Sequence, residues 1–298
     1  MSGKRLLLTG CNGQLGSTFS ALYKDSHLAG QYEFSSVDVE QVDFKNKESI
    51  LSVLSLNNPS IIVNCGAYTS VDKAEEEPDA AFKINDLATT IIANWSKENG
   101  SRLLHISTDF VFDGAKNSPY EPSDETNPLG VYGNTKLGGE RNIRNLLPKG
   151  GLILRTSWLY SEFGQNFVKT MLALMSKREE IGIVNDQIGS PTSTHSLVKI
   201  LFKIIENDNA SGIYHWCDGA AISWYDFAVE IQKQGLRNGL LEKKIPVKPI
   251  PGAGYSTLAE RPTYSVLDCE ATLIEFGVSK VDWKEELNYV ITAIAKAK

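Results

Sequence analysis

Tyr132 and Lys136 are the residues whose types and spacing most directly suggest chemistry. They are the first and last residues of the sequence Tyr-Gly-Asn-Thr-Lys, so on a helix their side chains lie on one face about one turn apart. A protonated lysine beside a phenol favours the phenolate, so we expect the pKa of Tyr132 to lie below its usual value of about 10. Tyr132 could then exchange a proton with an alcohol or ketone oxygen near neutral pH.

Thr108 is the third candidate for the same chemistry. It lies in the sequence Ser-Thr-Asp at the end of an apolar run upstream of the pair. Open α/β sheets bind their ligands at the carboxyl ends of strands, where Thr108 could donate a hydrogen bond to the reacting oxygen. A tyrosine and a lysine so spaced are common on helices. The upstream threonine and the glycine turn described next favour an active site over coincidence.

A glycine-rich turn follows the first apolar run. Residues 10–16 read Gly-Cys-Asn-Gly-Gln-Leu-Gly, with glycines three apart between a predicted strand and a predicted helix. Glycine permits a tight turn and a close backbone approach to a pyrophosphate, and the helix start offers free N–H groups and a positive dipole end. A plain turn is the alternative. The context favours a dinucleotide site formed by Gly10, Asn12, Gly13, Gln14, Leu15 and Gly16.

Asp38 follows the second predicted strand and could accept hydrogen bonds from the adenosine ribose of a dinucleotide. A solvated loop carboxylate is the alternative interpretation. At the ribose, Asp38 would lie where the 2′-phosphate of NADPH sits, and the neighbouring Cys11 and Val39 supply no positive charge. Both NADH and NADPH are candidate cofactors, and we expect catalytic efficiency with NADH to at least equal that with NADPH.

The elements that must position these residues alternate between strands and helices. Nearly continuous apolar runs predict buried strands over residues 5–9, 32–37, 61–64, 102–107 and 152–155. Helical patterns lie between them over residues 15–24, 47–56, 78–97 and 131–146. This alternation predicts an α/β fold, a Rossmann-type doubly wound parallel sheet.

After Arg155 the rhythm changes, because loops lengthen and prolines gather. Helices are expected over residues 166–177, 196–207, 224–234 and 283–295, with short strands over 181–184 and 212–216 that could return to the sheet. We therefore expect residues 1–155 to form a dinucleotide-binding Rossmann domain. Residues 156–298 should form mainly a smaller substrate-binding lobe.

Composition argues against several classes of protein. A net charge of -6 over 298 residues does not suit a nucleic-acid binder. No apolar run reaches the roughly 20 residues of a membrane-spanning helix, and the first run is too short for a signal peptide. The four cysteines form no CxxC pair and the four histidines no HxxxH spacing. We expect a cytoplasmic protein with reduced thiols, no membrane and no metal site.

The chain resembles the extended short-chain dehydrogenase/reductases, and within them the branch that reduces dTDP-4-dehydrorhamnose. The resemblance covers nearly the whole chain. The glycine turn and the Tyr-x-x-x-Lys sequence mark the superfamily. Three stretches are more specific to the branch: Ser-Thr-Asp-Phe-Val-Phe at 107–112, Arg-Thr-Ser-Trp at 155–158 and Asn-Asp-Gln-Ile-Gly-Ser-Pro-Thr at 185–192. The resemblance also includes residues 64–75, 128–140 and 261–262.

The resemblance implies a role for each matching residue. Tyr132 and Lys136 would be the catalytic pair and Thr108 the third member, while Lys136 would also hold the nicotinamide ribose. Asp109 and Trp158 would lie beside the sugar. The remaining cofactor residues would be Gly66, Ala67 and Tyr68 after the third strand, and Asn85 in the helix behind the lysine. Arg261 could contact a nucleotide phosphate through its guanidinium fork, with a surface salt bridge as the alternative.

The implied activity is NAD(P)H-dependent reduction of the 4-keto group of dTDP-4-dehydro-L-rhamnose to dTDP-L-rhamnose. A reductase or epimerase of another nucleotide-linked 4-keto sugar is one alternative. A non-catalytic dinucleotide-binding regulatory subunit of the methionine adenosyltransferase type is another. We expect a monomer or homodimer. Some family members carry a first-helix glutamate at a magnesium-bridged dimer contact, and Ser17-Thr18-Phe19 lacks it here, so activity and size should be indifferent to chelators.

Overall fold

A parallel sheet of six strands forms the centre of the molecule, in the order β2-β1-β3-β4-β5-β10. The computed structural model describes residues 3–254 and 257–297. The strands are β1 (Lys4–Thr9), β2 (Tyr32–Val37), β3 (Ile61–Asn64), β4 (Arg102–Thr108), β5 (Gly151–Thr156) and β10 (Gly212–His215). The winding reverses between β1 and β3, so the predicted doubly wound α/β sheet is confirmed.

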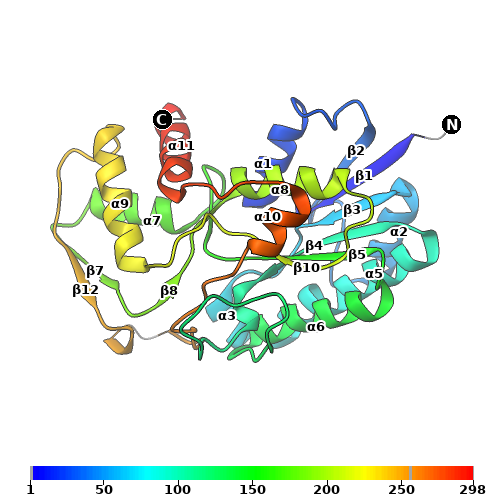
Figure 1. The fold of residues 1–298 in the computed structure, drawn as a ribbon, viewed down its shortest axis with the longest axis horizontal. Coiled ribbons are helices and arrows are strands. Elements are labelled where there is room, and N and C mark those ends of the chain that lie inside the picture. The colour runs from blue at the N-terminus through cyan, green and yellow to red at the C-terminus, as the bar shows by residue number, and fades with distance from the viewer. Residues whose placement is uncertain (1–2, 255–256, 298) are drawn as a thin grey trace.

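Helices cover both faces of this sheet (Figure 1). One face carries α1 (Gln14–Tyr23), α8 (Thr194–Glu206) and α10 (Glu270–Phe276), and the other carries α2 (Lys47–Asn57), α5 (Ala88–Asn99) and α6 (Val131–Leu146). Each face has its own hydrophobic cluster. Every residue of β3 and β5 is buried, as expected for strands covered from both sides.

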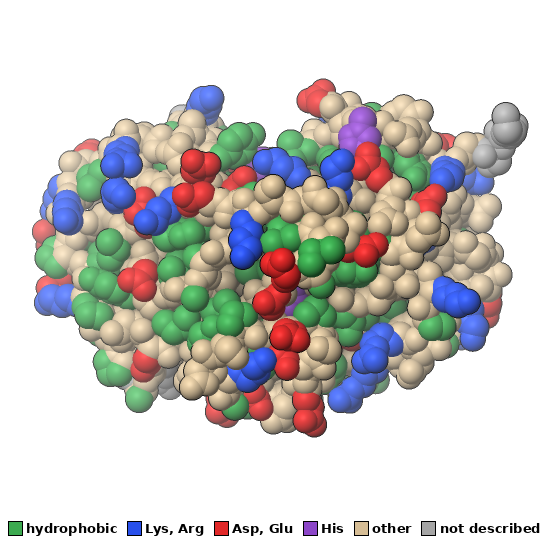
Figure 2. Space-filling view, in the orientation of Figure 1, with side chains coloured by type: hydrophobic (Ala, Val, Ile, Leu, Met, Phe, Trp, Pro, Cys, Tyr) green, Lys and Arg blue, Asp and Glu red, His purple; other side chains and the backbone are tan. Residues whose placement is uncertain are grey.

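A second lobe lies beyond the carboxyl ends of the strands, on the left of Figure 1. Its hydrophobic cluster joins α7 (Phe167–Met175), α9 (Trp224–Arg237) and α11 (Trp283–Lys296). Three two-stranded sheets complete it: β6 (Leu159–Tyr160) with β9 (Thr192–Ser193), β7 (Ile181–Val184) with β12 (Val247–Ile250), and β8 (Ile188–Gly189) with β11 (Ile222–Ser223). Hydrophobic side chains also gather on this side of the molecular surface in Figure 2.

Two of the predicted elements differ from the sequence expectation. Residues 181–184 do not return to the central sheet, because β7 pairs with β12 and packs under α7 and α9. Pro249 suits β12, since a strand with a single partner can lack one N–H donor. The helix expected over 78–97 is divided into α4 (Pro78–Phe82), a π-helical turn (Lys83–Leu87) and α5. No proline or glycine marks that turn in the sequence.

Short elements join these layers. The helix α3 (Val71–Glu76) follows the loop after β3, and a 3₁₀ turn (Asp109–Val111) follows β4 directly. Another 3₁₀ turn (Gly252–Gly254) follows β12. Across residues 3–254 and 257–297, no helix has the length and apolar character needed to cross a bilayer.

Candidate active site

A cleft of about 650 Å³ opens at the carboxyl ends of β1, β3, β4 and β5, at the point where the winding reverses. Both the turn after β1 and the Tyr132–Lys136 pair line it, although they are distant in sequence. The predicted residues that line the cleft are Gly10, Gly13, Gln14, Leu15, Gly16, Asp38, Gly66, Ala67, Thr108, Asp109, Tyr132, Lys136 and Trp158. The structure therefore brings most of the predicted site residues together.

The glycine turn has the geometry that a dinucleotide pyrophosphate requires. A Cβ on Gly16 would lie 2.2 Å from the carbonyl oxygen of Gly10, so α1 can start this close to β1 only without a side chain there. Gly13 has no side chain that could cap α1, so among the described residues no side chain at this position accepts from the first-turn N–H groups beside the cleft. Such a helix start attracts an anion, so the residues present fit the expected cofactor.

Asp38 braces the same turn. Its two carboxylate oxygens accept hydrogen bonds from the backbone N–H of Asn12 at 2.7 Å and of Val39 at 2.8 Å. The Asn12 side chain in turn donates to Glu40. Asn12 does not line the cleft, while Asp38 does, so this edge of the cleft carries negative charge held in a fixed position.

Thr108 and Tyr132 meet because α6 approaches the turn after β4 very closely. A Cβ on Gly133 would lie 2.2 Å from the carbonyl oxygen of Phe110, and the Phe110 and Tyr132 rings pack edge to face at 5.7 Å. The Thr108 hydroxyl donates to Asp109 Oδ1 at 3.1 Å and accepts from the N–H of Phe110. Thr108, Asp109 and Tyr132 therefore share one wall of the cleft.

The pKa of Tyr132 differs from the sequence expectation. Burial raises it to about 12, with the Thr108 hydroxyl lowering it and the Asp109 carboxylate raising it. The expected lowering by Lys136 was wrong for the chain alone, because burial dominates and the ammonium of Lys136 is bonded elsewhere. Tyr132 is thus a protonated phenol at neutral pH, which is the form that can donate a proton.

Lys136 is buried, and its Nζ donates to the carbonyl oxygen of Ile106 at 2.7 Å. It also lies 3.2 Å from His105 Nε2. Burial lowers the pKa of Lys136 to about 8, while the Glu140 carboxylate raises it. Burial likewise raises the pKa of Asp109 to about 6, so both groups titrate closer to neutrality than usual.

Asn85 supports the cleft from behind. It lies in the π-helical turn and is buried. Its amide oxygen accepts from the N–H of Tyr68 at 2.8 Å. Its amide nitrogen donates to the carbonyl oxygen of Tyr68 at 3.1 Å and to the Thr135 hydroxyl at 3.2 Å. The Tyr68 hydroxyl donates to Glu77 instead. Neither Asn85 nor Tyr68 lines the cleft. Their predicted contact with a cofactor stays a prediction, and the structure gives Asn85 a role in holding the loop after β3.

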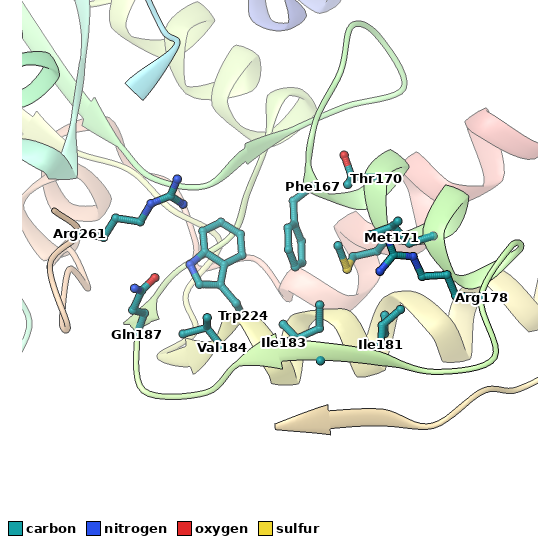
Figure 3. A pocket seen from close by; sticks show the side chains of 12 residues that line it. Phe167, Thr170, Met171, Arg178, Ile181, Ile183, Val184, Gln187, Trp224 and Arg261 are labelled. Carbon is teal, nitrogen blue, oxygen red and sulfur yellow. The ribbon is translucent and has the colours of Figure 1, made fainter. Parts of the chain in front are cut away.

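A second cavity of about 390 Å³ lies in the other lobe, shown in Figure 3. The rings of Trp224 and Phe167 stand beside each other within it, and Arg261 and Arg178 lie toward opposite ends. Trp158 stacks on Trp224 at 3.5 Å between ring centroids and also lines the first cleft. The stacked rings of Trp158 and Trp224 therefore lie between the two cavities. The backbone of Trp158 adopts the left-handed region with φ of 44°.

Arg261 lies outside the first cleft and lines the second cavity. Its guanidinium donates to Asp72 at 2.9 Å, so the salt bridge considered from the sequence is present. The buried Nε atom has no hydrogen-bond partner among the described residues, which leaves a donor available beside the cavity.

Several lining residues were not identified from the sequence. Trp224, Phe167 and Arg178 carry no local motif, whereas Gln187 lies in the Asn-Asp-Gln stretch and could have been singled out. Within residues 3–254 and 257–297, no group of three or more His, Cys, Asp or Glu side chains could hold a metal ion.

The doubly wound sheet, the uncapped glycine turn and the Thr108–Tyr132–Lys136 cleft together define a Rossmann-fold protein of the extended short-chain dehydrogenase/reductase type. The family can be stated more narrowly. A family model described as "RmlD substrate binding domain" matches residues 4–296, and the chain belongs to this family.

Individual relatives agree with this assignment. The chain is 40% identical over 291 residues to a dTDP-4-dehydrorhamnose reductase of Aggregatibacter actinomycetemcomitans, covering 96% of this chain and 98% of that protein. It superposes with a TM-score of 0.90 on a Bacillus anthracis dTDP-4-dehydrorhamnose reductase solved in complex with NADP, at 33% identity and covering 98% of this chain and 99% of that one. A Thermus thermophilus UDP-glucose 4-epimerase in complex with NAD shares the fold alone, with a TM-score of 0.80 at 17% identity over 98% of this chain and 99% of that one.

Proposed function

We propose that the protein reduces the 4-keto group of dTDP-4-dehydro-L-rhamnose to dTDP-L-rhamnose with NADH or NADPH. One observation carries the proposal: the glycine turn and the Thr108–Tyr132–Lys136 set open on the same cleft. The relatives named dTDP-4-dehydrorhamnose reductase support the choice of sugar.

The residues would divide the work by position. A reduced nicotinamide bound at the glycine turn and beside Gly66 and Ala67 would supply the hydride equivalent. Tyr132 is the proton donor to the oxygen, which its protonated phenol suits at neutral pH. Thr108 would donate a hydrogen bond to the same oxygen once its hydroxyl turns away from Asp109 Oδ1. Lys136, charged below about pH 8, adds a positive charge close to where negative charge develops and holds the nicotinamide ribose.

The cofactor and the sugar nucleotide would occupy adjoining spaces. The turn at residues 10–16 would bind the pyrophosphate, Asp38 the adenosine ribose, and Gly66 and Ala67 the nicotinamide half. Asp109 and Trp158 would lie beside the sugar, at the junction of the two cavities. The thymine would enter the cavity beside Trp224, with Arg261 near the phosphates.

This division supports a two-part organisation of the chain. Residues 1–155 would bind the cofactor, and residues 156–298 would mainly form the substrate lobe, with β10 contributed to the sheet. A cytoplasmic location and a monomeric or homodimeric state belong to the same proposal.

Oxidation of the reduced cofactor in the presence of dTDP-4-dehydrorhamnose tests the function. Stoichiometric loss of nicotinamide absorbance, with dTDP-L-rhamnose as product, is expected. The matched control is UDP-galactose, which an epimerase would convert without net oxidation of the cofactor. Conversion of either nucleotide sugar without oxidation would favour an epimerase. Cofactor binding with no turnover of any 4-keto sugar would favour a regulatory role.

A further inference from the structure

A row of polar side chains crosses the sheet beneath the cleft. Thr9, Asn64 and His105 are register partners on β1, β3 and β4, and all three are buried. The Thr9 hydroxyl lies 2.6 Å from Asn64 Oδ1, and Asn64 Nδ2 lies 3.0 Å from His105 Nδ1. His105 Nε2 completes the row 3.2 Å from Lys136 Nζ. The register partner of His105 on the next strand is the apolar Ile153, so the row ends at Lys136.

This row stands out from its surroundings. The same face of the sheet is otherwise packed with apolar side chains under α5 and α6, such as Leu103 and Ile153. Burying polar groups there is costly unless each is paired. Burial and the nearby Lys136 charge both hold the pKa of His105 well below its usual range, so His105 is neutral and carries a single ring proton.

Every polar group of the row can be hydrogen-bonded in two ways, with the donors pointing toward Lys136 in one and away from it in the other. In the arrangement described, Asn64 donates to Nδ1, the ring proton is on Nε2, and only an uncharged Lys136 amine could accept it. An ammonium has no acceptor, so a charged Lys136 must donate to a bare Nε2. The ring proton is then on Nδ1, the amide of Asn64 turns to accept it, and its nitrogen donates to Thr9.

We propose that His105 is a positioning residue of the active site, and that its ring proton changes nitrogen when Lys136 changes charge. When the Lys136 ammonium loses one proton to the cleft that it lines, Lys136 becomes a neutral amine. The ring proton of His105 is then on Nε2 instead of Nδ1. His105 thereby offers a partner to both forms of the lysine and keeps Nζ in one place. The inference rests on the proposed function, which gives Lys136 its role.

The other groups around Lys136 do not compete for this role. Cys65 stays a thiol because burial raises its pKa to about 12, and Tyr132 stays a phenol at neutral pH. The Glu140 carboxylate on α6 is engaged by Arg155 at 2.6 Å. Asp109 acts on Tyr132 across the cleft wall. His105 is thus the neutral partner that faces the ammonium directly.

Nitrogen NMR of the full chain labelled with ¹⁵N-histidine tests the proton position without any turnover. The four histidines are few enough to resolve, and the His105 signals are those missing from His105→Leu. We expect the Nδ1–H form at about pH 6.5 and the Nε2–H form at about pH 10, with a midpoint at the Lys136 titration. The same tautomer on both sides of that titration would overturn the proposal.

Turnover should fall at high pH as Lys136 loses its proton, and two variants should move this basic limb of the pH–turnover profile in opposite directions. His105→Leu removes the partner of the ammonium, so the limb should move down by about one pH unit and turnover should recover at lower pH. Asn64→Asp can only accept from the ring, which favours Nδ1–H, so the limb should move up. Ile153→Ala, at the same level of the sheet, should lower stability without moving the limb.

A merely structural role for His105 predicts a different result. Turnover would then fall equally at every pH in His105→Leu and Asn64→Asp, as in Ile153→Ala, and that outcome would refute the inference. The cofactor dissociation constant should follow the same pH limb, which gives a second readout that needs no sugar substrate. Failure of the wild-type protein to turn over dTDP-4-dehydrorhamnose would instead count against the proposed function and leave the NMR result valid.

Discussion

At the scale of single residues, burial governs the chemistry of the cleft more than neighbouring charge does. It raises the pKa of Tyr132 to about 12 and lowers that of Lys136 to about 8. Burial moves the two pKa values apart, because it disfavours the charged form of each group. The raised pKa of Tyr132 suits reduction, because the phenol must arrive protonated. Lys136 is still mostly charged at neutral pH, which lies below its pKa of about 8.

Tyr132→Phe removes the proposed proton donor while keeping the ring that packs on Phe110. Turnover with dTDP-4-dehydrorhamnose should fall by roughly 100-fold or more, and the dissociation constant of the cofactor should change little. Lys136→Met should lower turnover and weaken cofactor binding together. Steady-state kinetics and fluorescence titration measure the two effects. A Phe variant that keeps more than about half of the wild-type rate would contradict the assignment of Tyr132.

Asp38 allows a test of cofactor preference. Its carboxylate is fixed by the N–H groups of Asn12 and Val39, so it cannot easily turn away from a 2′-phosphate. We expect kcat/KM with NADH to at least equal that with NADPH, and Asp38→Asn to shift the ratio toward NADPH by about tenfold. The similar Bacillus anthracis structure contains NADP, so the expected preference for NADH would set this protein apart from that relative. A clear NADPH preference in the wild type would refute the expectation.

The residues named from the sequence and the contacts they make were not equally predictable. The pair Tyr132–Lys136 and the threonine at the end of β4 follow from residue type and spacing. The contacts of Lys136 with His105 and Ile106 depend on how strands pair, which no local pattern reports. For the same reason the pKa of Tyr132 was expected in the wrong direction.

At the scale of elements, the turn between β1 and α1 is the most constrained feature. Gly16→Ala would place a methyl group against the carbonyl of Gly10, so α1 must move away from β1. We expect cofactor affinity to fall by about tenfold or more, which corresponds to the 1–3 kcal/mol of a strained turn. Gly30→Ala is the matched control, because no atom of the described residues lies within 4 Å of its added Cβ. Equal affinities of the two variants, measured by titration, would argue against the turn as the phosphate site.

Regular elements were predictable wherever their periodicity was continuous. The bounds of β2, β3 and α6 match the sequence expectation because apolar runs and helical spacing are uninterrupted there. The π-helical turn at Lys83–Leu87 was not predictable, since an inserted residue leaves the helical pattern nearly intact. The strand β12 was missed because it is short, has one partner and contains Pro249.

At the scale of the whole molecule, the second half of the chain completes the sheet of the first. His215 on β10 is fully buried, accepts from Arg155 through Nε2 and donates from Nδ1 to the carbonyl of Tyr120 at 3.0 Å. Burial, with the Arg155 charge, lowers the pKa of His215 to about 3. Protonation of Nε2 would break the hydrogen bond from Arg155 and place the positive imidazolium beside the Arg155 guanidinium.

The pH dependence of stability follows from this contact. The pKa of His215 is lower in the folded chain than in the unfolded chain, where it is about 6.5, so the unfolded chain binds more protons between about pH 3 and 6.5. Stability should therefore fall as the pH drops below about 6.5, by up to about 1.4 kcal/mol per pH unit from this group. Urea unfolding of wild type and His215→Asn across this range isolates the effect. Parallel curves for the two proteins would refute it.

The position of β10 has a consequence for how the protein is made. Synthesis releases the chain from its N-terminus, so the outer edge of β5 stays without its partner until residues 212–215 have emerged, after α7 and α8. A nascent chain ending near residue 156 would expose an apolar, unpaired strand edge that can associate with other chains. Chaperone demand during translation should accordingly be greatest between the emergence of β5 and that of β10.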